Sequence, residues 1–229
     1  MTVKVGIVLF PGTNCEQDIA WVVEQLGGEP VMCWHGEPTV GDADAIVIPG
    51  GFAHGDYLRT GAIARFSPVM TAVREFAAQG GPVVGVCNGF QVLTEAGLLP
   101  GALQKNAGMK FLCETVEIRV ETQASVLTNQ VERGTTLRVP INHFEGNYVC
   151  DAPTLEQLRA EERVVVRYVD NPNGSLDDIA GICNEDRNVV GLMPHPERAS
   201  DIVLGSADGV VLLESLLHAA GAQSGRHAA

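Results

Sequence analysis

Several features that mark metal-binding, membrane-spanning and secreted proteins are missing from this sequence. Its six cysteines include no C-x-x-C pair, and no spacing of cysteine and histidine fits a zinc finger. No apolar run approaches the roughly 18 residues that a membrane span needs. The first strand-like segment, residues 3–10, is not preceded by the charged region of a signal peptide. We therefore expect no metal, no membrane partner, and a cytoplasmic location in which the thiols stay reduced.

Positive charge and phosphate-binding motifs are also scarce. The chain has 15 Lys and Arg against 28 Asp and Glu, a formal net charge of −13. This balance argues against nonspecific binding to nucleic acid or to anionic membranes. Neither G-x-x-x-x-G-K-[ST] nor G-x-G-x-x-G occurs. We expect no nucleic-acid partner, and neither an ATP site nor another cofactor in this chain.

Apolar residues make up 45% of the 229 residues, enough for a sizeable core in one domain that spans residues 1–229. In the first part of the chain, short apolar runs alternate with segments whose apolar residues recur at helical spacing. The strand-like runs are residues 4–10, 31–34, 45–48 and 83–86, and the helix-like segments are 14–27 and 63–79. This alternation predicts an α/β fold: a mostly parallel central sheet with helices on both faces. Its active site should lie at the carboxyl ends of the strands.

The second part of the chain follows a different pattern. Val116, Ile118 and Val120 alternate with charged residues, which is typical of a half-exposed strand. Further strand-like runs span residues 136–140, 147–150, 164–169, 179–183 and 189–193, and a closing helix spans 210–219. We therefore expect a smaller antiparallel strand layer beside the parallel core.

The most informative segment is Gly85-Val-Cys87-Asn-Gly89, in which an apolar run ends at a cysteine with a glycine on either side. A buried strand, a sharp turn that carries the nucleophile and a following helix are the parts of a nucleophile elbow. Small flanking residues leave space for the turn, and the N-terminus of a helix favours the thiolate over the thiol. The pattern predicts that Cys87 is a nucleophile.

A cysteine nucleophile needs a base, and the base needs an acceptor that fixes its tautomer. His195 and Glu197 offer both, two residues apart on a segment that its prolines should keep out of a helix. The oxyanion needs backbone N–H donors, which we expect from Gly51 and Asn88. Taken singly, the cysteine is typical of a core, His-Pro of a loop and Gly-Gly of a turn. Their joint position at strand ends favours a catalytic site.

Three separated motifs are similar to those of class I (triad) glutamine amidotransferases. They are Gly85-Val-Cys87-Asn-Gly89-Phe-Gln91, Pro49-Gly50-Gly51 and His195-Pro-Glu197. Residues 10–18, 50–62 and 145–148 further resemble the glutaminase subunit of phosphoribosylformylglycinamidine synthase, a purine-pathway enzyme. The resemblance covers nearly the whole chain, and its two departures, at Ala53-His54 and Asn142, lie outside the triad.

The resemblance implies how the chain would hydrolyse L-glutamine to glutamate and ammonia. Cys87 attacks the side-chain amide, His195 protonates the departing ammonia and then activates water, and Glu197 orients His195. The residues implied in oxyanion or substrate binding are Gly51, Asn88, Gln91 and His143. For His143, a polar loop of the antiparallel layer is an equally good interpretation. The loop of residues 52–60 is either a lid or partner contact near Cys87, or a solvated loop.

The resemblance also implies partners, because the acceptor must be activated by ATP before ammonia can react with it. A large synthetase subunit would bind ATP and magnesium and convert formylglycinamide ribonucleotide to formylglycinamidine ribonucleotide. A small accessory subunit is expected in the same complex. Three alternatives stay open: another cysteine hydrolase on the same scaffold, a non-enzymatic subunit, and the same glutaminase chemistry with another acceptor.

Overall fold

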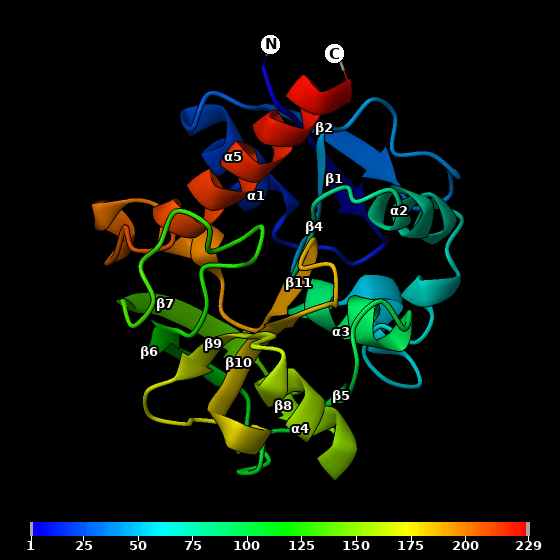
Figure 1. Ribbon diagram of the computed structural model, residues 1–229. Helices are drawn as coiled ribbons and strands as arrows, with labels where there is room; N and C mark the ends of the chain where they lie inside the picture. Colours follow the sequence, from blue (N-terminus) through cyan, green and yellow to red (C-terminus); the bar gives the residue numbers. More distant parts are fainter. Residues whose placement is uncertain (1, 228–229) are drawn as a thin grey trace.

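The central sheet of the described chain, residues 2–227, has nine strands in the order β2-β1-β3-β4-β11-β10-β9-β6-β7 (Figure 1). The computed structural model describes side chains as far as residue 222. The parallel strands are β2 (Glu29–Trp34), β1 (Lys4–Leu9), β3 (Ala45–Ile48), β4 (Val83–Val86) and β11 (Val189–Leu192). The strands antiparallel to their neighbours are β10 (Ile179–Cys183), β9 (Val164–Tyr168), β6 (Leu112–Val120) and β7 (Thr136–His143).

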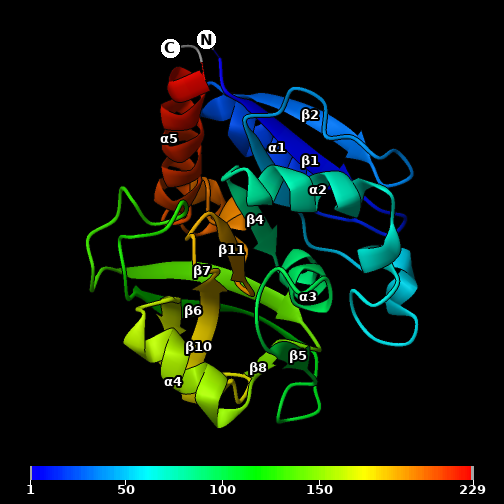
Figure 2. The same ribbon diagram turned by 45° about the vertical axis from the view of Figure 1, so that its right-hand side comes forward.

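Helices cover both faces of the parallel part of the sheet (Figures 1 and 2). On one face lie α1 (Glu16–Gln25) and α5 (Val210–His227), and on the other α2 (Val69–Ala78) and α3 (Asn88–Glu95). Helix α4 (Ala152–Ala160) lies in the half of the molecule that holds the antiparallel strands, as does a two-stranded sheet of β5 (Ala102–Gln104) and β8 (Asn147–Val149). The short 3-10 turns are η1 (Ala53–Asp56), η2 (Ala64–Phe66), η3 (Leu176–Asp178), η4 (Pro196–Arg198) and η5 (Ile202–Leu204).

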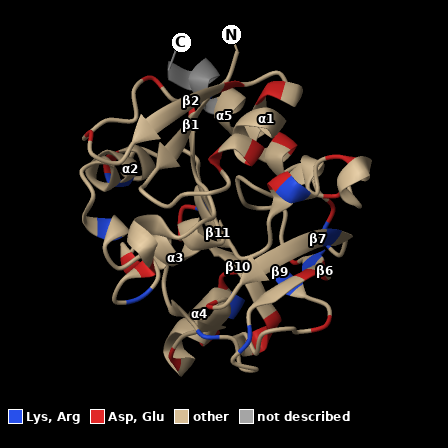
Figure 3. Cartoon of the chain, turned by 180° about the vertical axis from the view of Figure 1, so that it is seen from behind, with Lys and Arg blue, Asp and Glu red and all other residues tan. Residues whose placement is uncertain are grey.

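The middle strands of the parallel part are buried on both faces, which explains their unbroken apolar sequences. Every residue of β3, β4 and β11 is buried. Figure 3 shows the acidic and basic residues on the outer helices, loops and strands and none on β11. A fully buried valine or leucine side chain contributes about 1.5–3 kcal/mol. This part therefore forms a firm support for residues at its strand ends.

The antiparallel strands continue the same sheet instead of stacking on it as a layer. β10 pairs antiparallel with β11, and β9, β6 and β7 follow outward. In β6, Val116, Ile118 and Val120 are buried while Glu117 and Arg119 between them are exposed, as the alternation predicts. The expected mostly parallel α/β sheet with a smaller antiparallel part is confirmed, and the separate antiparallel sheet is the pair β5–β8.

Two local predictions differ from the structure. The helix expected over residues 63–79 is divided, because Pro68 separates the turn η2 from α2 and has no N–H to continue a helical ladder. Helix α4 was not predicted, although its start carries a recognisable signal. The Asp151 side chain accepts a hydrogen bond from the Thr154 backbone N–H at 3.0 Å, and a proline occupies the first turn.

Two findings concern membrane spans and cysteines. No helix in residues 2–227 has the length and apolar character to cross a bilayer. All six cysteines are free thiols. Their burial varies more than their apolar surroundings suggest: Cys15, Cys33, Cys87 and Cys183 are buried, but Cys113, on the exposed face of β6, is not.

Candidate active site

Cys87 lies on a sharp turn between β4 and α3, as the elbow pattern predicts. Its backbone has φ 52° and ψ −105°, a left-handed conformation that costs a non-glycine residue about 1–3 kcal/mol. The turn is held because the Cys87 N–H donates to the Leu192 carbonyl of β11 at 2.8 Å. A β carbon at Gly89 would lie 1.9 Å from the Ile48 carbonyl oxygen, and one at Gly85 would lie 2.6 Å from the Gly89 backbone. The two glycines are therefore a packing requirement of the elbow.

His195 and Glu197 form a buried pair just beyond the end of β11. The Nδ1 atom of His195 lies 2.6 Å from Oε1 of Glu197, and the two residues are 1% and 2% exposed. The prediction that prolines keep this segment out of any helix is wrong, because residues 196–198 form the 3-10 turn η4. Proline suits the first position of such a turn, where no N–H is required. The turn places the carboxylate beside the imidazole.

The charged form of His195 is favoured by its neighbours. Burial by itself lowers the pKa of His195, but the negative charge of Glu197, and after it that of Cys87 as a thiolate, overcome this effect and raise the pKa well above its usual value. The other ring nitrogen, Nε2, is buried and has no hydrogen-bond partner among the described residues. That nitrogen is free to exchange a proton with a nucleophile, while Nδ1 is held by the carboxylate.

A cavity of about 280 Å³ joins the predicted residues. It is lined by Gly51, Cys87, Gln91, His143 and His195, among others. Asn88 and Glu197 do not line it: Asn88 begins α3 directly after Cys87, and Glu197 contacts the His195 imidazole. A larger groove of about 830 Å³ adjoins this cavity; Glu197 lines it, but Cys87 and His195 do not. The smaller cavity is therefore the candidate active site.

Gly51 and the first turn of α3 form one side of the cavity. Gly51 has φ 145°, and a β carbon there would lie 2.6 Å from the backbone nitrogen of Asn14, so only glycine fits. The Asn88 side chain donates to Gln91 Oε1 at 2.8 Å, and the Gln91 amide in turn donates to the Glu145 carbonyl. The Gln91 side chain is thus fixed in the cavity wall by bonds at both ends.

His143, at the end of β7, also lines the cavity. Its Nδ1 lies 3.1 Å from the Asn106 side-chain oxygen, which also accepts from the Gly146 N–H. Burial, and to a smaller extent His195, lower the pKa of His143 to about 4. The imidazole is therefore neutral near pH 7, and with Nδ1–H donating to Asn106 its Nε2 is an acceptor. Of the two interpretations of this residue, the structure favours the cavity wall over a polar loop.

The loop of residues 52–60 lies partly in the cavity and partly in solvent. Phe52, Asp56 and Thr60 line the cavity, whereas Tyr57 and Leu58 are 74% and 90% exposed. Burial raises the pKa of Asp56 to about 6, although its hydrogen bond from the Asn88 amide works in the opposite direction. The loop therefore contributes a weakly acidic carboxyl to the cavity and apolar side chains to its surroundings.

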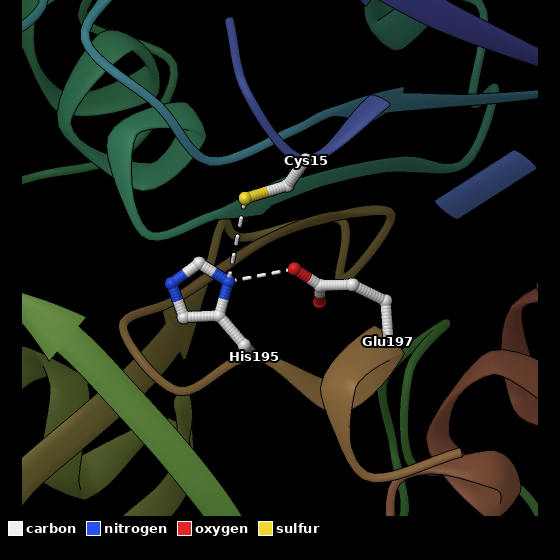
Figure 4. A group of neighbouring side chains, drawn as sticks. All are labelled: Cys15, His195 and Glu197. Carbon is white, nitrogen blue, oxygen red and sulfur yellow. Dashed lines mark hydrogen bonds and ion pairs between the residues drawn. The ribbon is translucent and has the colours of Figure 1, made fainter. Parts of the chain in front are cut away.

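Two residues of the site were missed by sequence reasoning. Cys15 lies beside the His195–Glu197 pair, with its Sγ 3.9 Å from His195 Nδ1 (Figure 4). Arg198 donates from Nη2 to the same sulfur at 3.2 Å. A signal was present, because residue 15 follows the turn at the carboxyl end of β1, the sheet edge that carries Cys87.

Known proteins resemble this chain over nearly its whole length. Residues 2–208 match the CobB/CobQ-like glutamine amidotransferase domain. The phosphoribosylformylglycinamidine synthase subunit PurQ of Koribacter versatilis is 55% identical over 226 residues, which cover 94% of this chain and 98% of that protein. The protein of the same name from Rubrobacter xylanophilus is 56% identical over 214 residues, 93% and 97% of the two chains. The chain belongs to the PurQ family of glutamine amidotransferases.

Solved structures agree with this assignment. A chain in the structure of PurLQS from Thermotoga maritima has 40% identity and a TM-score of 0.88, covering 95% of this chain and 99% of that one. A putative GMP synthase subunit from Thermoplasma acidophilum, at 12% identity and a TM-score of 0.71 over 100% and 99% of the two chains, shares the fold alone. Membership of the PurQ family makes the chain an enzyme, a glutamine amidotransferase, and confirms the resemblance predicted from the three motifs.

Proposed function

We propose that the chain acts as a single domain over residues 1–229 and hydrolyses L-glutamine through Cys87, His195 and Glu197. The ammonia passes to a synthetase subunit that converts formylglycinamide ribonucleotide to formylglycinamidine ribonucleotide with ATP in purine biosynthesis. The observation that carries the proposal is the buried His195–Glu197 contact of 2.6 Å beside a cavity that Cys87 also lines.

The first half-reaction forms a thioester. The Cys87 thiol gives its proton to Nε2 of His195, and the sulfur attacks the side-chain amide carbon of glutamine. The carbonyl oxygen becomes an oxyanion, which the backbone N–H groups of Asn88 and Gly51 stabilise. Collapse of this intermediate breaks the C–N bond as the imidazolium returns its proton to the departing nitrogen. Ammonia and a glutamyl thioester on Cys87 are the products.

The second half-reaction releases glutamate. Neutral His195 takes a proton from water, and the resulting hydroxide attacks the thioester carbon. The carbon–sulfur bond breaks, and the sulfur recovers its proton from His195. Glu197 supports both halves because its negative charge stabilises the imidazolium, in agreement with the raised pKa of His195.

The remaining cavity residues bind and orient the substrate. Gln91 and His143 both line the cavity, and each is fixed by hydrogen bonds to the protein. Asp56 and Glu145 add two carboxyl groups, and their mutual repulsion contributes to the raised pKa of Asp56. The α-ammonium group of glutamine would relieve this repulsion if it bound between them.

The partners of this reaction are inferred from the relatives. The PurQ proteins are named as subunits of phosphoribosylformylglycinamidine synthase, and the Thermotoga structure is of PurLQS. These names support assembly of this chain with other subunits of a synthase. The proposal includes a synthetase subunit that would hold ATP and magnesium, and a small accessory subunit. The proposal includes a cytoplasmic location and neither a nucleic-acid nor a membrane partner.

The test measures glutamate released from glutamine by the purified chain, with and without the synthetase subunit, ATP and formylglycinamide ribonucleotide. We expect release to rise strongly when these are added. Cys87→Ala should abolish release yet leave the complex able to use ammonium salts, whereas Cys183→Ala, at another buried thiol, should change neither.

Each other outcome removes a defined part of the proposal. Release that is indifferent to the synthetase and the ribonucleotide would keep the glutaminase chemistry but remove the proposed acceptor. Glutamine hydrolysis by Cys87→Ala would remove the proposed nucleophile. Loss of the ammonium-dependent reaction in the same variant would indicate a structural role for this cysteine.

A further inference from the structure

We propose that Cys15, held by Arg198, is a positioning residue that fixes the catalytic imidazole of His195. The inference rests on the proposed function, because it concerns the same base. Cys15 precedes helix α1 and is 2% exposed. Its sulfur lies 3.9 Å from Nδ1 of His195, the nitrogen that also contacts the Glu197 carboxylate (Figure 4).

The sulfur of Cys15 is itself held in place. Arg198 Nη2 donates to it at 3.2 Å, and Arg198 Nε donates to Asp18 Oδ2 at 3.1 Å. A chain of contacts therefore runs from α1 through the guanidinium to the sulfur and on to the imidazole. Because Arg198 belongs to η4, the turn that also carries Glu197, the chain ties this turn to the helix after β1.

The three groups Cys15, His195 and Glu197 lie within 4.8 Å of one another, a spacing that also suits a metal ion. Two contacts argue for a hydrogen-bond network instead. The guanidinium of Arg198 places a positive charge against the sulfur, and Nδ1 of His195 is already engaged with the carboxylate. A cation at this position would face electrostatic repulsion and would have to break the His195–Glu197 bond.

The packing around His195 shows how the Cys15 sulfur confines the imidazole. A β carbon on Gly50 would lie 2.6 Å from Cε1 of His195 and 3.1 Å from the Cys15 sulfur. The imidazole is thus confined between the Gly50 backbone, the sulfur and the carboxylate. A ring confined in this way keeps Nδ1 toward Glu197 and leaves Nε2 for the nucleophile. The sulfur also occupies space in which water would compete for the Nδ1–Glu197 bond.

The contact has an electrostatic consequence that a purely structural cysteine would lack. Glu197 and Cys87 have the larger effects in raising the pKa of His195, and the hydrogen-bond contact with Cys15 adds to them. The nearby His143 is neutral near pH 7. Removal of the Cys15 sulfur should therefore lower the pKa of His195, so that the imidazolium needed to protonate the leaving ammonia is lost at a lower pH.

The test compares Cys15→Ala, Cys15→Ser and Cys33→Ala in the complex with the synthetase, by kcat, KM and their pH profiles. Cys33 is a buried thiol on β2 that does not line the active-site cavity, so its alanine variant controls for the loss of a buried sulfur. We expect Cys15→Ala to lower kcat about tenfold, less than the roughly 10²-fold that a 1 Å misplacement can cost. KM should stay within about twofold, and the alkaline limb of kcat should move to lower pH. Cys15→Ser should recover part of the loss in kcat and part of the shift in pH profile. Cys33→Ala should match the wild type in both measurements.

Unchanged kcat and pH profile in Cys15→Ala would overturn the inference, as would equal losses in the Cys15 and Cys33 alanine variants. If Cys15→Ala fails to fold, Cys15→Ser and Asp18→Asn replace it in the test. Asp18→Asn weakens the Asp18–Arg198 contact and leaves the Cys15 sulfur in place. Asp18→Asn should shift the pH profile in the same direction by a smaller amount, and an unshifted profile in both would overturn the inference. Failure of the proposed function is distinguishable, because it appears as glutamine hydrolysis by Cys87→Ala.

Discussion

The parallel and antiparallel halves of the sheet contribute different things to one cavity. Of the parallel strands, β4, β3 and β11 lead into Cys87, Gly51 and His195 at their carboxyl ends. The antiparallel strands β10, β9, β6 and β7 contribute His143 and, in the loop after β7, Glu145. The groups that act on the scissile bond thus come from the parallel half, whose middle strands are buried on both faces, and the antiparallel half contributes part of the cavity wall.

The position of β11 explains why these groups meet. β11 is parallel to β4 and antiparallel to β10, so it is the boundary between the halves. Its Leu192 pairs with Val86 of β4, which places the residues after both strands at the same edge of the sheet. His195, three residues beyond this pair, is thereby brought to the nucleophile that follows Val86. Its backbone N–H donates to Pro140 of β7, which ties the base to the antiparallel half as well.

The largest effect should follow from a change in charge at the base. Glu197→Gln keeps an oxygen acceptor but lets the amide donate to Nδ1, which favours the wrong imidazole tautomer. We expect kcat for glutamine hydrolysis to fall by about 10³- to 10⁴-fold. Steady-state glutamate release measures this, with the exposed Glu162→Gln as the control. A loss below tenfold would show that the carboxylate charge is unimportant and would weaken the contrast between the halves.

The next largest effect should be on the stability of the parallel half. Gly89→Ala adds a β carbon 1.9 Å from the Ile48 carbonyl, although alanine is the better helix former. We expect the free energy of unfolding to fall by about 3 kcal/mol. Gly108→Ala is the control, because a β carbon there meets nothing within 4 Å. Urea denaturation of both variants checks the prediction, and equal midpoints would contradict it.

A third prediction concerns the pH dependence that His143 gives to the antiparallel half. Its pKa of about 4 in the folded chain lies below the usual 6.5, so the unfolded chain binds more protons between these values. This contribution to stability is lost as the pH falls from 6.5 to 4. Asp56, with its pKa raised from 3.8 to about 6, acts in the opposite sense and adds stability as the pH falls. His195 titrates above 6.5 and lies outside this window.

The test of the His143 prediction compares His143→Gln with the wild type by urea denaturation at pH 7 and pH 4.5. The variant lacks the proton uptake on unfolding, so its stability should fall less toward acid. The two proteins should differ in this fall by up to roughly 3 kcal/mol over the whole window. An identical fall in both would mean that the imidazole is not buried in the neutral form.

The smallest effects should distinguish the two kinds of strand. Val83 and Val84 point to opposite faces of β4 and are both fully buried, so Val83→Thr and Val84→Thr should each cost about 1–3 kcal/mol for a buried hydroxyl. In β6 only alternate positions are buried, so the reverse change at the exposed Thr115, to valine, should stay within about 0.5 kcal/mol. Thermal unfolding of the three variants measures the difference. A neutral result at either valine would show that β4 has an exposed face.

Local sequence determined the elements and the residues that carry the chemistry. Unbroken apolar runs predicted β3, β4 and β11, because strands buried on both faces need apolar side chains at every position. The alternation of apolar and charged residues predicted β6, because only one face of this strand is buried. The sequence also showed the glycines beside Cys87 and the two-residue spacing of His195 and Glu197. Both patterns could be recognised because each constraint acts within a few residues.

Tertiary structure decided which distant residues meet. Helix α4 and the break at Pro68 had local signals, but the continuation of one sheet through β10, β9, β6 and β7 did not. Cys15 and His195 are 180 positions apart, and their contact follows from the packing of α1 against η4. The wall position of His143 likewise depends on Asn106, 37 residues away. Residue patterns specify which surfaces each element must bury, whereas contacts between distant residues arise only when those surfaces pack together.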